Sequence, residues 1–300
     1  SINQPSSSAP IRTFEVFSNQ QPTYYAAIRA FRNENRDISP ILGFGCTFAG
    51  PLDEVNQTGE FTNVPEWGTI TLEETSRTID APVIAANDLV PWRMSMDALH
   101  DDPANFKRLK NGTPVGSVQS AVAPGGGYNS SVSRTGEIPH DVEHGHGALP
   151  AISREDIPLL DFLFEKLNGQ PCWEDVVSGP GLVNVYEFYL HNSGQARSEV
   201  QNQDLWQTNK PAAIARAVRS NSDPVCIAAY KTYVKYLGGM SGMQALYSGA
   251  RKKIGLGGNT IKFTGDVPVD FITHPQAVHI GISQLISTQL ASIDLGGSVS

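Results

Sequence analysis

The sequence has few cysteines, no long apolar run and no excess of positive charge. Its three cysteines, Cys46, Cys172 and Cys226, lie far apart and show no CxxC spacing. They indicate neither a zinc cluster nor a disulfide framework, and they suit a reducing compartment. No apolar run approaches the roughly 20 residues that a membrane-spanning helix needs. The net charge of −8 argues against non-specific binding to nucleic acid or to anionic membranes.

The chain is long enough to bury a substantial core. Its 300 residues, 40% of them hydrophobic, suit one large or two medium domains. Residues 1–10 are polar and contain two prolines, so we expect a flexible arm there. The first residue is serine, which predicts either a removed targeting segment or a fragment. The compartment therefore stays open between an organelle, after N-terminal processing, and the cytoplasm.

The first third of the chain has an α/β pattern. Residues 11–18 alternate and are rich in β-formers, which predicts a strand, and residues 23–33 carry apolar residues at helical spacing. Short apolar runs at 41–48 and 82–86 predict buried strands. Strands separated by helical stretches favour a partly parallel sheet. We expect a smaller α/β domain over residues 11–100.

The rest of the chain is predicted to be mostly helical. A polar, glycine-rich region at 100–135 comes first. A capping-box-like start at Ser153–Asp156 and a stop at Asn168-Gly169 then bound a helix. We expect a larger, mostly helical α/β domain over 101–300. Its further predicted elements are helices at 175–190, 210–218 and 224–246, a strand at 271–273 and a terminal helix at 280–290.

One motif is specific enough to suggest a family. Residues 178–186, SGPGLVNVY, resemble the SGPGL(V/A)NLY stretch of bacterial-type glucokinases. Other family elements match in the same order, so the resemblance runs from about residue 12 to residue 290. These matches are the turn Ala49-Gly50-Pro51, Thr62-Asn63 with Trp67, the pair Asn87-Asp88, and Glu143-His144-Gly145-His146, which fits EGGH. The resemblance implies the actin-like ATPase superfamily, a hexokinase-type fold of two α/β domains that close on a cleft.

The resemblance also implies a sugar site. A hexose is recognised through its hydroxyls, which need carboxylates, amides and imidazoles as partners. In such kinases the aspartate of the ND pair, here Asp88, takes the proton from the C6 hydroxyl as it attacks the γ-phosphate. The side chains placed around the sugar by the resemblance are Asn87, Asp88, Glu143, His146 and Glu174.

These residues also have structural interpretations. Asp88 could cap the helix that follows it. Glu174 could help Asp175 to start a helix through the helix dipole. His144 and His146 could be loop histidines without a ligand. Each of these alternatives stays open at the level of sequence.

A metal site is a further alternative for one loop. His140, Glu143, His144 and His146 lie within seven residues and carry groups that bind transition metals. Their spacing fits no standard zinc motif. We therefore expect no metal.

The nucleotide half of the family pattern is weak in this sequence. Residues 1–11 contain nothing like the family's DxGGTN turn, and the GTGLG-type loop survives only as Gly125, Gly126 and Gly127 within APGGGYN. The adenosine-side GG motif is missing, since the chain passes from residue 253 almost directly to the late strand. Losing three charge-assisted hydrogen bonds costs on the order of 5–9 kcal/mol, enough to abolish a micromolar nucleotide site. We expect no cofactor, and Mg-ATP only if the chain is a kinase.

The principal functional hypothesis is a degenerate glucokinase-like protein without kinase activity. It would act as an accessory or scaffolding subunit of a larger assembly and retain hexose binding. Because its N-terminal sheet would lack the first strands, other protein subunits are expected to donate strands. The alternatives are an ATP-dependent glucokinase with Asp88 as base and a non-catalytic sugar sensor. The expected small-molecule partner is glucose, with neither nucleic acid nor a membrane span.

Overall fold

The computed structural model describes residues 20–38, 40–62, 64–99, 104–257, 269–272 and 282. The chain divides into two compact units, each with its own core. Unit 1 comprises Ser1–Phe106, Gly136–His140 and Thr273–Ser300, and unit 2 comprises Lys107–Thr135 and Asp141–Ile272. The predicted arm at 1–10 and strand at 11–18 lie outside the described residues, as does nearly all of the predicted helix at 280–290.

Unit 1 is built around two parallel strands. β1 (Phe44–Phe48) pairs with β5 (Val83–Asn87) in register from Phe44↔Val83 to Phe48↔Asn87. Because side chains alternate along a strand, the pair buries a cluster on each face. One cluster joins β1 to the helices α1 (Tyr24–Glu34) and α2 (Leu72–Ile79), and the other joins β5 to α3 (Leu89–Ala98). The helix predicted at 23–33 and the buried strand predicted at 82–86 are confirmed, and the run at 41–48 becomes a strand only from Phe44.

A small antiparallel sheet completes the described part of unit 1. Its order is β2-β3-β4, formed by β2 (Leu52–Asp53), β3 (Thr58–Gly59) and β4 (Ile70–Thr71), and a 3₁₀ turn, η2 (Pro65–Trp67), precedes β4. Gly59 lies against the Phe48 ring, which a Cβ at this position would approach to 2.9 Å. Rings of Tyr24, Phe48, Phe61 and Trp67 pack together here with centroids 5.0–6.5 Å apart. The segment that carries Thr62 and Trp67 is therefore part of the hydrophobic core of unit 1.

Unit 2 contains a six-stranded sheet. Three of its strands come from the polar region at 106–134, for which the sequence predicted no elements. Two of these strands form an antiparallel hairpin, and its buried serines are hydrogen-bonded. Ser120 Oγ, for example, donates to the carbonyl oxygen of Ser131 across the hairpin at 2.9 Å, so polar residues can occupy buried positions of the sheet. The sheet order is β6-β11-β10-β7-β8-β9, with β6 (Phe106–Lys110), β7 (Val118–Pro124), β8 (Tyr128–Arg134), β9 (His140–Val142), β10 (Lys253–Leu256) and β11 (Val269–Ile272).

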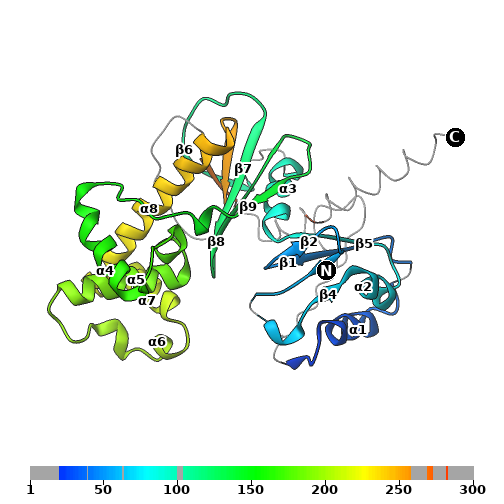
Figure 1. Ribbon diagram of the computed structural model, residues 1–300, viewed down its shortest axis with the longest axis horizontal. Coiled ribbons are helices and arrows are strands. Elements are labelled where there is room, and N and C mark those ends of the chain that lie inside the picture. The colour runs from blue at the N-terminus through cyan, green and yellow to red at the C-terminus, as the bar shows by residue number, and fades with distance from the viewer. Residues whose placement is uncertain are drawn as a thin grey trace. The chain divides into compact units, whose positions relative to one another are not determined.

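The helices of unit 2 share one core with this sheet (Figure 1). The capping box at Ser153–Asp156 is confirmed, and the following helix ends at Leu167 because Asn168 adopts a left-handed conformation. The helix predicted from residue 175 begins later, since Ser178 Oγ accepts the N–H of Gly181 as the cap. The helices are α4 (Ile157–Leu167), α5 (Gly179–Asn192), α6 (Asp204–Thr208), α7 (Lys210–Arg219) and α8 (Pro224–Ser248).

Among the described residues, no helix is both long and apolar enough to cross a bilayer.

Candidate functional site

Asn87 and Asp88 lie where β5 ends and α3 begins, in unit 1. Asn87 is buried, and its Oδ1 accepts the N–H of Leu89 at 2.9 Å. The Asp88 N–H donates to the carbonyl oxygen of Phe48 at 3.1 Å. Asp88 occupies the N-cap position of α3, as the structural alternative predicted, but its side chain makes no capping hydrogen bond, and the Asn87 side chain bonds the helix start instead. A half-buried carboxylate thus follows the carboxyl end of a parallel strand, where α/β proteins commonly bind ligands.

Glu174 lies in unit 2, on the 3₁₀ turn η5 (Trp173–Asp175). Its Oε2 accepts the backbone N–H of Tyr128 at 2.9 Å. A Cβ on Gly127 would come within 2.7 Å of the same oxygen, so the glycine permits this approach. The turn start is capped by Asp175, whose Oδ2 accepts the N–H of Cys172 at 2.8 Å. Glu174 therefore anchors the β7–β8 turn, and it also lies with Asp175 in the first turn of η5, as the structural alternative predicted.

Glu143 precedes the 3₁₀ turn η3 (His144–His146), and His146 is its last residue. His146 Nε2 lies 3.6 Å from Glu143 Oε2, and the two side chains are 66% and 53% exposed. The η3 turn packs closely against β8 at Gly145. A Cβ at this position would lie 2.1 Å from the carbonyl oxygen of Tyr128 and 3.1 Å from Glu174 Oε2. The structure thus brings Glu143, His146 and Glu174 to one end of the β7–β8 hairpin. Asn87 and Asp88 lie in unit 1.

The glycine turn Gly125–Gly127 connects β7 to β8. The Gly125 N–H donates to the carbonyl oxygen of Gly127, and the Gly179 N–H donates to that of Gly125, both at 2.8 Å. Around Gly126 a Cβ would meet no atom within 4 Å. The turn therefore contacts the amino end of α5, whose backbone N–H groups favour a negatively charged ligand.

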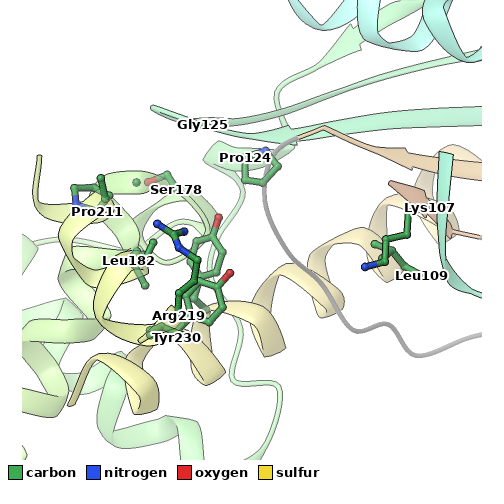
Figure 2. A pocket seen from close by; sticks show the side chains of 14 residues that line it. Lys107, Leu109, Pro124, Gly125, Ser178, Leu182, Pro211, Arg219 and Tyr230 are labelled. Carbon is green, nitrogen blue, oxygen red and sulfur yellow. The ribbon is translucent and has the colours of Figure 1, made fainter. Parts of the chain in front are cut away.

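A cavity of about 760 Å³ opens beside this turn, within unit 2. Figure 2 shows Ser178 and Pro211 on one side of it and Lys107 and Leu109 of β6 on another. Arg219, at the end of α7, and Tyr230 of α8 project into it. Its volume lies in the range of small-molecule pockets, and its lining combines aromatic, aliphatic and cationic groups.

Potential metal ligands do not cluster in the described part of the chain. No three histidine, cysteine, aspartate or glutamate side chains converge there as metal ligands, and this includes residues 140–146. Burial raises the pKa of both Cys46 and Cys226 to about 12. These two free cysteines are therefore protonated at neutral pH and are not nucleophiles.

Sequence reasoning missed the contacts that hold the site. It did not identify the Tyr128 N–H as the partner of Glu174, which lies 46 residues away in the chain. It also missed Arg219 and Tyr230, which carry no motif. The only signal in the sequence was the glycine at 127, whose lack of a side chain lets the Glu174 carboxylate approach.

Comparisons with known proteins give one consistent result. The family model described as Glucokinase matches residues 3–263. A glucokinase from Mesorhizobium japonicum is 25% identical over 279 residues, which are 84% of this chain and 76% of that protein. The crystal structure of a glucokinase from an Antarctic psychrotroph has a TM-score of 0.70 at 21% identity and covers 89% of this chain and 87% of its own. The crystal structure of Balamuthia mandrillaris glucokinase in complex with glucose has a TM-score of 0.69 at 18% identity, covering 87% and 82%.

Proposed function

This chain belongs to the glucokinase family, and we propose that it binds glucose or a closely related aldohexose. The observation that carries the proposal is the anchored carboxylate of Glu174, held by the Tyr128 N–H beside the exposed pair of Glu143 and His146. The similar glucokinase of Balamuthia mandrillaris has a structure in complex with glucose, which supports the same ligand class here. The proposed sugar-binding side chains are Asn87, Asp88, Glu143, His146 and Glu174.

The chemistry of these groups suits a polyhydroxylated ring. Carboxylates accept hydrogen bonds from ring hydroxyls, and the amide and imidazole both donate and accept. A carboxylate already fixed by one backbone N–H presents its remaining lone pairs in one direction. Its side chain therefore loses little rotamer freedom when a sugar binds. A ligand that lacks a matching hydroxyl leaves such a group unpaired, at about 1–3 kcal/mol.

Calorimetric titration of the full chain with glucose tests this proposal. Glu174→Gln should weaken glucose binding about 10- to 100-fold, the loss expected for one charged hydrogen-bond acceptor. Glu165→Gln, which changes an exposed carboxylate on α4, is the matched control and should bind as the wild type does. Equal affinity of the two variants would contradict the assignment of Glu174.

A second candidate function is ATP-dependent phosphorylation of the bound hexose. The cavity beside the Gly125–Gly127 turn favours it, because a nucleotide needs an apolar pocket for its base next to backbone N–H groups for its phosphates. Arg219 and Lys107 would add positive charge at its wall. Asp88 would be the base that accepts the proton of the attacking hydroxyl. Gly126 stands where the family has a hydroxyl residue, which weakens the phosphate site.

The variant Asp88→Asn tests the kinase function directly. In the full chain with glucose and Mg-ATP, it should abolish hexose phosphate formation, because the amide cannot accept the proton. Asp80→Asn replaces an exposed aspartate in the left-handed conformation that asparagine also tolerates, and it should retain activity. Glucose binding without product in the wild type would exclude the kinase and favour a sugar sensor.

An accessory role in a larger assembly is the third candidate. Within the described residues, β1 and β5 form a sheet of only two strands, which strands from another chain could extend. Light scattering on the native protein tests this role. A folded monomer without co-purifying chains would contradict it.

A further inference from the structure

The two histidines of the η3 turn have different surroundings. His146 is exposed and faces Glu143, as a ligand-binding side chain should be. His144 instead packs against two other elements of unit 2. Its Nδ1 lies 3.5 Å from Ser130 Oγ on β8, and its ring centroid lies 6.0 Å from that of Tyr247 on α8.

The contact with α8 includes a buried amide. Gln244 and Tyr247 are three residues apart and so share a face of the helix. Gln244 is only 1% exposed, and its Nε2 donates to Ser120 Oγ on β7 at 2.9 Å. Its Oε1 is a buried acceptor with no hydrogen-bond partner among the described residues, and this amide acts to raise the pKa of His144. His144 thereby connects the turn to both α8 and the sheet.

The backbone transmits this anchoring to the neighbouring residues. The Gly147 N–H donates to the carbonyl oxygen of His144 at 3.0 Å, and the His146 N–H donates to that of Glu143 at 3.4 Å. The Trp173 N–H donates to the Gly147 carbonyl oxygen at 3.0 Å, which ties the turn to the segment carrying Glu174. Backbone hydrogen bonds thus link His144 to the groups proposed to bind the sugar.

We propose that His144 is a positioning residue for hexose binding, which docks the η3 turn on α8 and thereby aims Glu143 and His146 at the sugar. This inference rests on the proposed hexose-binding function. The role differs from that of His146, because His144 would not touch the ligand.

Protonation gives this role a signature. Burial lowers the pKa of His144 below its ordinary 6.5, and the interaction with Gln244 partly offsets the effect. The docked turn therefore favours the neutral imidazole. The contribution of His144 to docking is complete above pH 6.5 and declines as the pH falls towards its lowered pKa. The titratable groups around His144 are Glu143 and His146 on its own turn, Glu174 on η5 and Tyr247 on α8, while Ser130 of β8 and Gln244 are neutral.

Hydrogen exchange of the full chain without ligand tests the docking itself. His144→Ala should raise the exchange rates of the amides of residues 146–149 about tenfold, the effect of losing about one hydrogen bond. His191→Ala removes an exposed histidine on α5 and should leave these rates unchanged. Unchanged exchange in His144→Ala would overturn the proposal.

Glucose titrations at pH 7.5 and 5.5 test the effect on binding. His144→Ala should bind about tenfold more weakly at pH 7.5, whereas His144→Gln, which keeps a polar neutral end group, should bind nearly as the wild type does. Lowering the pH from 7.5 to 5.5 should weaken glucose binding more in the wild type than in His144→Gln. Both proteins retain His146, so any effect of that residue is common to the two. Equal affinity of His144→Ala and wild type would overturn the proposal. If wild type binds no glucose, the proposed function fails, and the exchange rates still decide whether His144 docks the turn.

Discussion

At the scale of single residues, the candidate site depends on close backbone approaches. Gly145 faces the carbonyl oxygen of Tyr128, an atom of the backbone that cannot rotate away as a side chain can. We expect Gly145→Ala to displace the η3 turn and to lower stability by about 1–3 kcal/mol, the usual cost of overpacking. Glucose affinity should fall with it. Thermal unfolding and glucose titration measure the two effects.

Gly169→Ala is the matched control for this substitution. The nearest atom to its Cβ would be the carbonyl oxygen of Leu167 at 3.9 Å, so the methyl group has room. The same stability and affinity in both variants would contradict the close approach at Gly145.

Motifs suggest which residues form the candidate site, but they do not give the contacts of those residues. The pattern around Asn87-Asp88 and Glu143–His146 names side chains that suit a sugar. It does not show that Asn87 rather than Asp88 bonds the start of α3, because both residues are good caps. Nor does it show that His144 packs while His146 is exposed, since one turn presents them in different directions.

At the scale of elements, the start of α8 depends on one carboxylate. Asp223 Oδ1 accepts the N–H groups of Val225 and Cys226, at 2.9 and 3.1 Å, and Oδ2 accepts the Val200 N–H at 3.1 Å and the Ser198 hydroxyl. Burial alone would raise the pKa of Asp223, but these hydrogen bonds outweigh it and lower the pKa. Because the pKa of Asp223 is lower in the folded than in the unfolded state, its stabilising effect is complete above the unfolded-state pKa of about 3.9. The effect is lost as the pH falls through the folded-state pKa.

Asp223→Asn should therefore destabilise the protein most at neutral pH. We expect a loss of about 1–3 kcal/mol in the free energy of unfolding at pH 7, with a smaller difference from wild type near pH 3. Urea unfolding at the two pH values measures it. The control is Asp161→Asn, an exposed position on α4. A difference that does not shrink at low pH would contradict a role for the ionised cap.

Helices were more predictable than strands in this chain. The capping box before α4 is a local signal, and the structure confirms it together with the helices predicted at 210–218 and 224–246. β7 and β8 lack an apolar pattern, since serines at 120, 130 and 131 are buried. Ser120 Oγ donates to the carbonyl oxygen of Ser131 across the hairpin, and Ser130 Oγ donates to that of Val142 in β9. Their burial depends on partners elsewhere in the fold, which sequence periodicity does not reveal.

At the scale of the whole molecule, the order of motifs predicted the family correctly. The family match and the solved glucokinase structures confirm the α/β fold that the resemblance to glucokinases implied. The cavity of unit 2 could not be predicted in the same way, because Lys107, Gly125, Pro211 and Tyr230 come from separate segments and meet only in the fold. Loss of nucleotide binding stays a prediction, and the position of this cavity beside the glycine turn is the reason to test it with Mg-ATP.

Glucose binding by the folded 300-residue chain is the central claim, and calorimetric titration tests it most directly. We predict saturable binding of about one glucose per chain, with a dissociation constant of about 1 mM or lower. A deoxyglucose that lacks a recognised hydroxyl should bind about tenfold or more weakly, because a polar group of the site is left unpaired. A folded protein that takes up no glucose at millimolar concentration, or that binds both sugars equally, would contradict the claim.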